Sequence, residues 1–230
     1  SAFVLRAFNV ETARAMDVAS DPKIGLMRLL WWQEAIDNIF ANKLIEHQAA
    51  QALASVISEH KISKSWLKRS VEARINDARR EVTDIPETVE ELEKYAEDIV
   101  STLLYTTLQA GDIRSTVADH AASHIGKASG LLLLLKSLPY HASRNFQFSY
   151  IPFEVAAKHG LLVQQGGRSE ICLDSREGLR DAVFEIASVA NAHLQKAREF
   201  AGTVLAEALP SASASCACSG YFGFFESCAV

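Results

Sequence analysis

The sequence contains little of what stabilises small secreted or turn-rich proteins. Its 230 residues include only five prolines, eleven glycines and four cysteines. So few prolines and glycines argue against an all-β fold with many tight turns. Three of the four cysteines (Cys216, Cys218 and Cys228) lie at the extreme C-terminus, so no disulfide framework runs through the body of the chain. This distribution suits a reducing compartment.

A long hydrophobic run and an excess of positive charge are also missing. The five leucines from Leu131 to Leu135 form a run far shorter than the roughly 20 residues that span a membrane. Lysine and arginine number 23 against 28 acidic residues, which gives a net charge of −5. This balance argues against nucleic acid as the main partner.

What the sequence does contain is helical periodicity. Eight helices are expected, beginning near residues 2, 22, 46, 63, 88, 119, 153 and 174, because apolar residues recur there three and four positions apart. Residues 161–173 are expected to form a loop. Pro139 and Pro210 are expected to end the sixth and eighth helices. The sequence therefore predicts a single all-α bundle over residues 1–209 and an irregular or disordered tail over residues 210–230.

The central helix has two unlike halves. Its first half is polar and small and offers Asp119, His120, His124 and Lys127 to a possible polar ligand. Small residues, among them Gly126 and Gly130, would let a neighbouring helix come close, and the leucines after them would fill a core. His120 and His124 lie four apart on one helical face, as in zinc hydrolases, but no glutamate follows the first histidine to act as a base. We therefore expect no metal site.

Two stretches are candidates for an external surface. Trp31 and Trp32 are adjacent and cannot share one face of a helix, so one of them is expected at a second contact. The fourth helix carries a basic face that includes Lys64, Lys68 and Arg69. That face is either an ordinary solvated surface or a surface that meets acidic lipid or an acidic partner.

Several blocks together resemble the squalene/phytoene synthase superfamily. They are AFNVETARAMD (7–17), IGLMRLLWWQEAIDNIF (24–40), EELEKYAEDIVSTLLY (90–105) and DHAASHIGKASG (119–130). The segments HIGKA and YHASR look most like its divergent mitochondrial branch, the NADH dehydrogenase (ubiquinone) complex I assembly factor 6 type. The resemblance implies an isoprenoid-synthase-like helical bundle around a central cavity.

Active synthases of this superfamily are expected to hold magnesium and a diphosphate between two aspartate-rich helices. Magnesium requires several hard carboxylate oxygens. At the corresponding positions this chain has Ala13, Arg14 and Asp17 in the first motif, and Leu133, Ser137 and His141 in the second. One carboxylate cannot hold a metal cluster, so the resemblance implies a pseudoenzyme with no cofactor.

Two functions remain open at this point. The first is a non-catalytic assembly factor for mitochondrial respiratory complex I, on the matrix side of the inner membrane, whose partners would be complex I assembly intermediates and the membrane surface. The second is a prenyl-diphosphate-binding protein or residual prenyltransferase, in which cations such as Arg14, Lys127 and Lys136 would contact phosphate without a metal.

Overall fold

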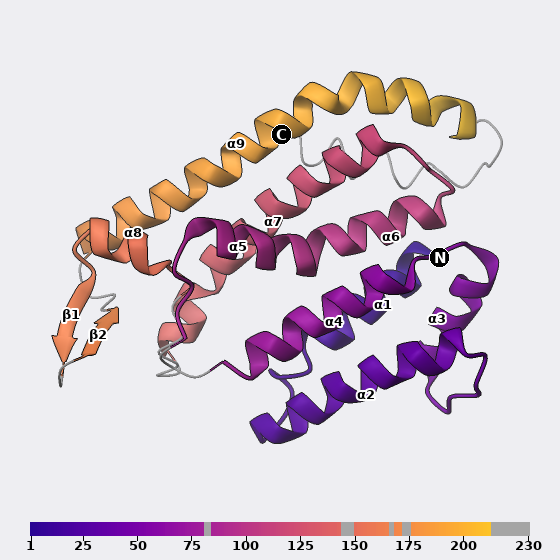
Figure 1. The fold of residues 1–230 in the computed structure, drawn as a ribbon, viewed down its shortest axis with the longest axis horizontal. Helices are drawn as coiled ribbons and strands as arrows, with labels where there is room; N and C mark the ends of the chain where they lie inside the picture. Colours follow the sequence, from indigo (N-terminus) through magenta and orange to yellow (C-terminus); the bar gives the residue numbers. More distant parts are fainter. Residues whose placement is uncertain (81–83, 144–149, 166–167, 172–175, 213–230) are drawn as a thin grey trace.

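The computed structural model describes residues 1–80, 84–143, 150–165, 168–171 and 176–212 (Figure 1). Within these ranges the chain forms nine α-helices, one π-helical turn (η1) and two short strands. In chain order they are α1 (Ala2–Ala13), α2 (Pro22–Phe40), α3 (Gln48–Glu59), α4 (Lys64–Ala78), α5 (Val89–Ala96), η1 (Glu97–Ser101), α6 (Thr102–Ala110), α7 (Thr116–Ser143), α8 (Phe153–Lys158), β1 (Leu162–Gln165), β2 (Arg168–Ile171) and α9 (Arg176–Ala212). The all-α prediction is confirmed in its main feature.

The helices fall into two packed groups (Figure 1). Helices α1 to α4 enclose one apolar core, centred on Leu5, Leu29, Ile36 and Leu53, all of which are fully buried. Helix α9 lies along α7 over the largest helix–helix contact, and α7 packs on α5, η1 and α6. Helix α4 joins the two groups because it contacts α2 on one side and α6 and η1 on the other.

Helix α7 approaches its neighbour very closely, as the small residues of its first half predicted. A Cβ atom added to Gly126 would lie 2.6 Å from Cα of Ser101, and one added to Gly130 would lie 2.8 Å from Cα of Ala96. Both distances are shorter than van der Waals contact, so only glycine fits. The Oγ of Ser101 donates a hydrogen bond of 3.2 Å to the carbonyl of Ser123 across this contact.

The leucine run fills the core only in part. Leu131 and Leu134 are buried against Leu92 and Ile186, whereas Leu132 and Leu133 are exposed. A helix turns by about 100° per residue, so five consecutive side chains cannot all face one neighbour. The prediction that all five leucines fill the core was therefore wrong for the two that point outward.

Both prolines lie inside helices and not at their ends. Helix α7 continues past Pro139 to Ser143, and α9 continues past Pro210 to Ala212. A proline removes one main-chain hydrogen bond but leaves its neighbours free to keep helical geometry when packing favours it. Beside Pro139, Leu138 is buried against Ile151 and Val155, which fixes this part of α7. The two predicted helix ends were wrong.

The expected loop after residue 161 contains a β-hairpin. Strands β1 and β2 pair antiparallel, with Leu162 opposite Ile171 and Gln165 opposite Arg168. Two residues, Gly166 and Gly167, separate the strands in sequence, which is the spacing of a tight hairpin. The loop prediction was wrong because this glycine pair was not taken as a hairpin signal. The predicted tail lies almost wholly outside the described residues.

Candidate functional site

The residues predicted to occupy the first motif position lie at the end of α1 and include a single carboxylate. Ala13 is the last residue of α1, Arg14 is its C-terminal cap, and Asp17 follows in the turn. All three side chains are exposed. Arg14 places a positive charge where a magnesium ion would need a ligand, so this end of α1 does not fit a metal-bound diphosphate.

The second motif position, on α7, offers no acid among its described side chains. The Leu133 side chain is 55% exposed. The hydroxyl of Ser137 donates a hydrogen bond of 2.7 Å to the carbonyl of Leu134, so it is already used within its own helix. His141 belongs to α7, but its side chain lies outside the described part of the chain. Leucine and a helix-bonded serine cannot coordinate magnesium.

A network of the protein's own side chains converges on Asp77, at the end of α4. Its Oδ2 accepts hydrogen bonds from the hydroxyls of Tyr95, at 3.1 Å, and Tyr150, at 3.0 Å. Its Oδ1 accepts one from Arg80, at 3.2 Å. Burial, and then the negative charge of Asp77, raise the pKa of both tyrosines, so both stay neutral donors.

Next to this network, Arg74 ties α4 to α1. Its Nη2 donates a hydrogen bond of 2.7 Å to the side-chain oxygen of Asn9, and its Nη1 donates to the carbonyl of Ser70 at 3.2 Å. Burial lowers the pKa of Arg74 to about 10, which leaves it charged at neutral pH. Asn9 and Ser70 also line a hollow of about 10 Å³, which has room for about one water molecule. This part of the interior is filled by protein side chains.

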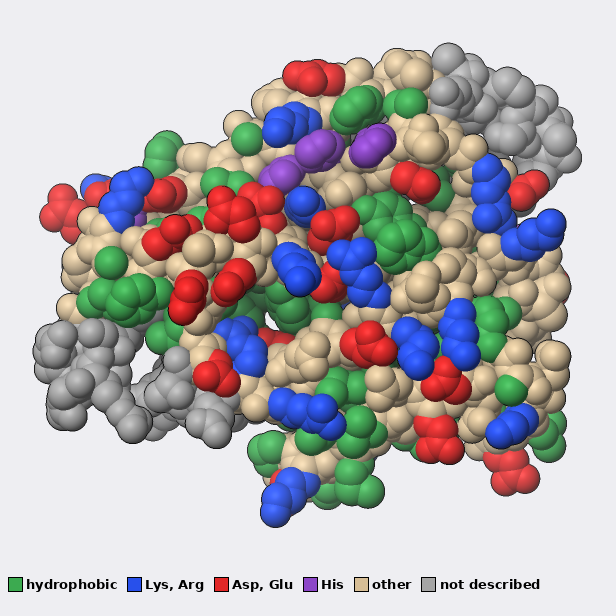
Figure 2. Space-filling model, in the orientation of Figure 1, with side chains coloured by type: hydrophobic (Ala, Val, Ile, Leu, Met, Phe, Trp, Pro, Cys, Tyr) green, Lys and Arg blue, Asp and Glu red, His purple; other side chains and the backbone are tan. Residues whose placement is uncertain are grey.

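The polar half of α7 forms a second network with α5, η1 and α9. The Nδ1 atoms of His124 and His193 are 2.8 Å apart, and Nε2 of His193 lies 3.2 Å from Oε2 of Glu93. Lys127 lies 3.9 Å from Glu93 and 3.6 Å from Glu97. Burial, and then the neighbouring His193, lower the pKa of His124. Figure 2 shows histidine side chains gathered over α7 and α9.

Glu97, in the π-helical turn, is the centre of this Glu97 network. Besides Lys127, it accepts hydrogen bonds from Tyr105, at 3.2 Å, and Ser123, at 3.4 Å, and lies 4.0 Å from Arg69. A π-helical turn inserts an extra residue and rotates the side chains that follow it. Four polar partners thus converge on Glu97.

The four predicted ligand residues separate into two pairs. His124 and Lys127 belong to the Glu97 network, so Lys127 is paired with carboxylates and is not aimed at a phosphate. Asp119 and His120 are exposed, and His120 lies against the ring of Phe200, with the ring centres 6.3 Å apart. Among the described residues, no group of three or more metal-ligating side chains is placed to hold an ion.

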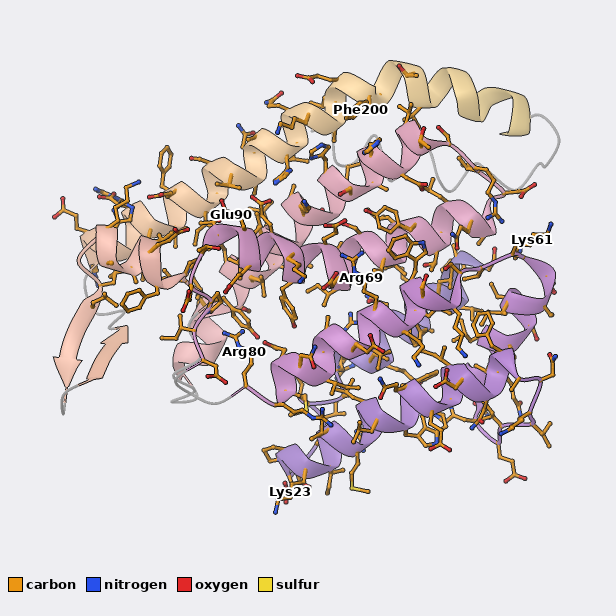
Figure 3. All side chains as sticks on the ribbon, viewed as in Figure 1. Lys23, Lys61, Arg69, Arg80, Glu90 and Phe200 are labelled. Atoms are coloured by element: carbon orange, nitrogen blue, oxygen red, sulfur yellow. The ribbon has the colours of Figure 1, made fainter. Side chains whose placement is uncertain are left out.

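The predicted basic surface of α4 is largely paired with the protein's own acids. Lys64 and Lys68 lie 2.7 Å and 3.2 Å from Asp37 of α2, and Arg69 binds Asp98 of η1 (Figure 3). This pairing takes away the main support for α4 as a partner surface, which stays a prediction.

The tryptophan pair divides as predicted. Trp32 is 3% exposed in the first core, whereas Trp31 is 38% exposed and contacts the ring of His47. Trp31 therefore remains available to an external partner, and Trp32 does not.

Sequence reasoning missed the acids, the tyrosines and the histidine that complete both networks. They are Asp77, Glu93, Tyr95, Glu97, Tyr150 and His193. One signal was present: Glu93 and Glu97 lie four apart and so share a helical face. The sequence did not indicate that α7 would place Lys127 against that face.

The all-α bundle is similar in fold to a solved synthase structure. A crystal structure of a dehydrosqualene synthase superposes with a TM-score of 0.67 at 15% identity, over 86% of this chain and 65% of that one. The sequence pattern of squalene/phytoene synthases matches residues 1–222, and the chain belongs to that family.

Curated relatives carry a different name from the synthases. The chain is 38% identical to NADH dehydrogenase (ubiquinone) complex I, assembly factor 6, of Rattus norvegicus over 211 residues, which are 92% of this chain and 61% of that protein. The homologue of Drosophila melanogaster is 39% identical over 86% of this chain and 59% of its own length. The Dictyostelium discoideum homologue is 36% identical, with 88% and 55% covered. The chain thus spans about three fifths of the length of these relatives.

Proposed function

We propose that this protein acts by binding, as an assembly factor for mitochondrial respiratory complex I, and does not transfer prenyl groups. Three curated relatives of similar sequence are named for that role. The partners would be complex I assembly intermediates. The place of action would be the matrix side of the mitochondrial inner membrane. Within the described residues no helix is both long and apolar enough to cross a bilayer, and a peripheral position is compatible with that finding.

One feature of the sequence supports the proposal: the residues predicted to occupy the two motif positions lack the acids that magnesium requires. Ala13, Arg14 and Asp17 supply a single carboxylate, and Leu133 and Ser137 supply none. Stabilising the charge of a departing diphosphate is the main task of such a site, and divalent ions do it through carboxylate ligands. The Asp77 network supports the same conclusion, because the hydroxyls of Tyr95 and Tyr150 donate to a carboxylate of the protein itself.

The alternative is a prenyl-diphosphate-binding protein or residual prenyltransferase, in which cations alone bind phosphate. Arg14 and Lys136 are exposed, so they could contact an anion at the surface. Lys127 does not support this alternative, because Glu93 and Glu97 surround it. The sequence resemblance to synthases keeps the alternative worth testing.

A biochemical test separates the two functions. The purified chain is incubated with farnesyl or geranylgeranyl diphosphate and Mg²⁺, and released diphosphate and prenyl products are measured. We expect no turnover above that of the heat-denatured protein. As a matched challenge, the variants Ala13→Asp and Leu133→Asp add back one acid to each motif. Turnover by the unmodified chain would reject the proposal.

A genetic test addresses complex I itself. Deleting the gene in its own organism should lower the amount of assembled complex I in native gels and leave complexes III and IV unchanged. Re-expression of the Asp17→Asn variant should restore complex I, because the proposed role needs no metal-binding acid. Normal complex I after deletion would contradict the assembly role.

A further inference from the structure

The exposed apolar side chains of this protein are concentrated at its N-terminal end. Eleven large hydrophobic residues are exposed in the described part of the chain, and seven of them precede residue 45. Three form one stripe on α2: Ile24 is 44% exposed, Met27 is 67% exposed and Trp31 is 38% exposed. Their spacing of three and four residues places them on one side of the helix.

This stripe faces away from the bundle. The opposite side of α2 carries Gly25, Leu29, Trp32 and Ile36, all of which are buried in the first core. Helix α2 lies at one edge of the molecule, and no described element covers its outer side (Figure 1). In Figure 2 apolar and basic side chains gather at that edge. An exposed apolar stripe at an edge generally marks a contact with something else.

Two cations flank the N-terminal half of the stripe. Lys23 and Arg28 are exposed, and within the described ranges neither has a carboxylate within 4.0 Å. Figure 3 shows Lys23 at the free end of α2. In this they differ from Lys64 and Lys68 of α4, which lie 2.7 Å and 3.2 Å from Asp37. The free basic charge of this edge is therefore on α2 and not on α4.

We propose that the N-terminal half of α2 is a docking surface for an anionic lipid bilayer. An interfacial helix inserts a shallow apolar stripe between headgroups, with cations beside it that meet lipid phosphates. Tryptophan suits that depth because its ring is apolar and its N–H is polar. Long basic side chains lay their aliphatic stems along the apolar stripe and keep their charge at the surface. Ile24, Met27 and Trp31 supply the stripe, and Lys23 and Arg28 supply the charge.

Acidic neighbours limit the surface to that half of the helix. Asp21 is occupied as the N-terminal cap of α2, where its side chain accepts the backbone N–H of Lys23 at 2.8 Å. Glu34 is exposed beyond Trp31, and its charge would oppose an anionic surface. The inserted region is therefore short, and binding is weak, reversible and sensitive to salt. This inference rests on the proposed function, which places the protein at a membrane, and it names the surface that would contact that membrane.

Vesicle flotation tests the surface directly. The purified full chain is mixed with vesicles of phosphatidylcholine containing one third phosphatidylglycerol, and the floated fraction is compared with that on pure phosphatidylcholine. We expect preference for the anionic vesicles, and loss of binding as salt is raised. Met27→Glu should weaken binding by about ten-fold, because it puts a charged side chain in place of a methionine that the bilayer would bury. Lys23→Gln and Arg28→Gln should each weaken binding by about five-fold.

Phe184→Glu is the matched control. Phe184 is 73% exposed on α9, far from α2 in the sequence, so this variant makes the same kind of charge change elsewhere. It should float like the native chain, and Glu34→Gln should float better. Circular dichroism verifies that each variant keeps its helices. The proposal is overturned if the native chain does not float, or if Met27→Glu and Phe184→Glu float equally well.

A different occupant would give a different result. If light scattering shows a dimer that Met27→Glu disrupts, and no vesicle binding occurs, a second copy of the chain covers the stripe and the lipid proposal is wrong. None of these results depends on complex I. A protein that floats but whose deletion leaves complex I intact would refute the proposed function alone.

Discussion

The Asp77 network and the Glu97 network are built from similar residues but behave differently. In the first, one carboxylate accepts from two half-buried tyrosines and from Arg80, and the pKa of both tyrosines is raised, so both keep their protons at neutral pH. In the second, Glu97 and Glu93 share Lys127, and the chain of contacts ends in two histidines. The first is a fixed structural link, whereas the second contains His124, whose pKa is lowered by burial and by His193. Two polar clusters in one bundle therefore need different tests.

Removing the acceptor of the fixed network should have the largest effect. Asp77→Ala removes the carboxylate to which Tyr95 and Tyr150 donate, whereas Arg80 keeps its hydrogen bonds to the carbonyl of Asp84. We expect the free energy of unfolding in urea to fall by about 3 kcal/mol, at roughly 1.5 kcal/mol for each of the two tyrosine hydrogen bonds to the carboxylate. Glu199→Ala, at an exposed side chain of α9, is the control and should change little. Equal losses in the two variants would contradict a structural role for Asp77.

Neutralising the centre of the second network should cost less. Glu97→Gln keeps the size of the side chain and some of its hydrogen bonds, but it loses the charge that Lys127 and Arg69 face. We expect a loss of about 1.5 kcal/mol in the free energy of unfolding. Glu90, which is exposed at the start of α5 (Figure 3), provides the matched variant Glu90→Gln. A loss as large as that of Asp77→Ala would remove the distinction between the networks.

Acid should act on the second network through His124. Burial, His193 and the cations Lys196, Lys127 and His120 lower its pKa in the folded state, so folding favours the neutral imidazole. The unfolded chain takes up the proton first. Stability should therefore fall as the pH drops below about 6.5, the usual histidine pKa, and through the lower folded value.

Unfolding midpoints measured over that pH range provide the test. His124→Asn should flatten the dependence, whereas His60→Asn, at the end of α3, should leave it as in the native chain. The dependence should persist in Asp77→Ala, because that network contains no histidine. An unchanged slope in His124→Asn would assign the acid sensitivity to another group.

The α4 cations should show the smallest effect of all. Lys64→Ala and Lys68→Ala each remove one partner of Asp37, but the Lys64 and Asp37 side chains are 42% and 44% exposed. Exposed ion pairs are screened by water and salt and contribute little. The Lys64 and Lys68 salt bridges lower the pKa of Asp37, and this shift should vanish in the double variant when the carboxyl is titrated by NMR. A large loss of stability would show that this pair is buried in solution.

Much of the fold could be predicted, because its periodicity is local in the sequence. The spacing of three and four from Ile24 to Phe40 predicted α2 as a helix, and the structure forms it. Of the residues in that pattern, Ala35 and Ile36 are buried, whereas Ile24, Met27 and Trp31 are exposed. The errors arose where a single residue type was taken as decisive. Pro139 did not end its helix, and the glycine pair after Gln165 joins two strands in sequence and does not mark a loop.

The polar networks could not be predicted in the same way, because their members come from helices distant in the sequence. In the sequence Lys127 has no evident partner, because its partners Glu93 and Glu97 lie in other elements that pack against α7. The prediction of altered motifs came from the sequence alone, because it depends only on whether an acid is present at each predicted position. The hydrogen bond of the Ser137 hydroxyl to the carbonyl of Leu134, in contrast, could be seen only in the folded helix.

The contact of Gly126 and Gly130 with the stretch from Ala96 to Ser101 has a consequence for how this protein can vary. Backbone touches backbone there, so the alignment of α7 with the π-helical turn is set without help from any charged group. Substituting Lys127 or Glu97 therefore alters energy while the helices keep their register. A methyl group at either glycine would instead separate the helices and misalign every polar partner at once. Natural variants of the protein should accordingly exchange these charges more freely than the two glycines.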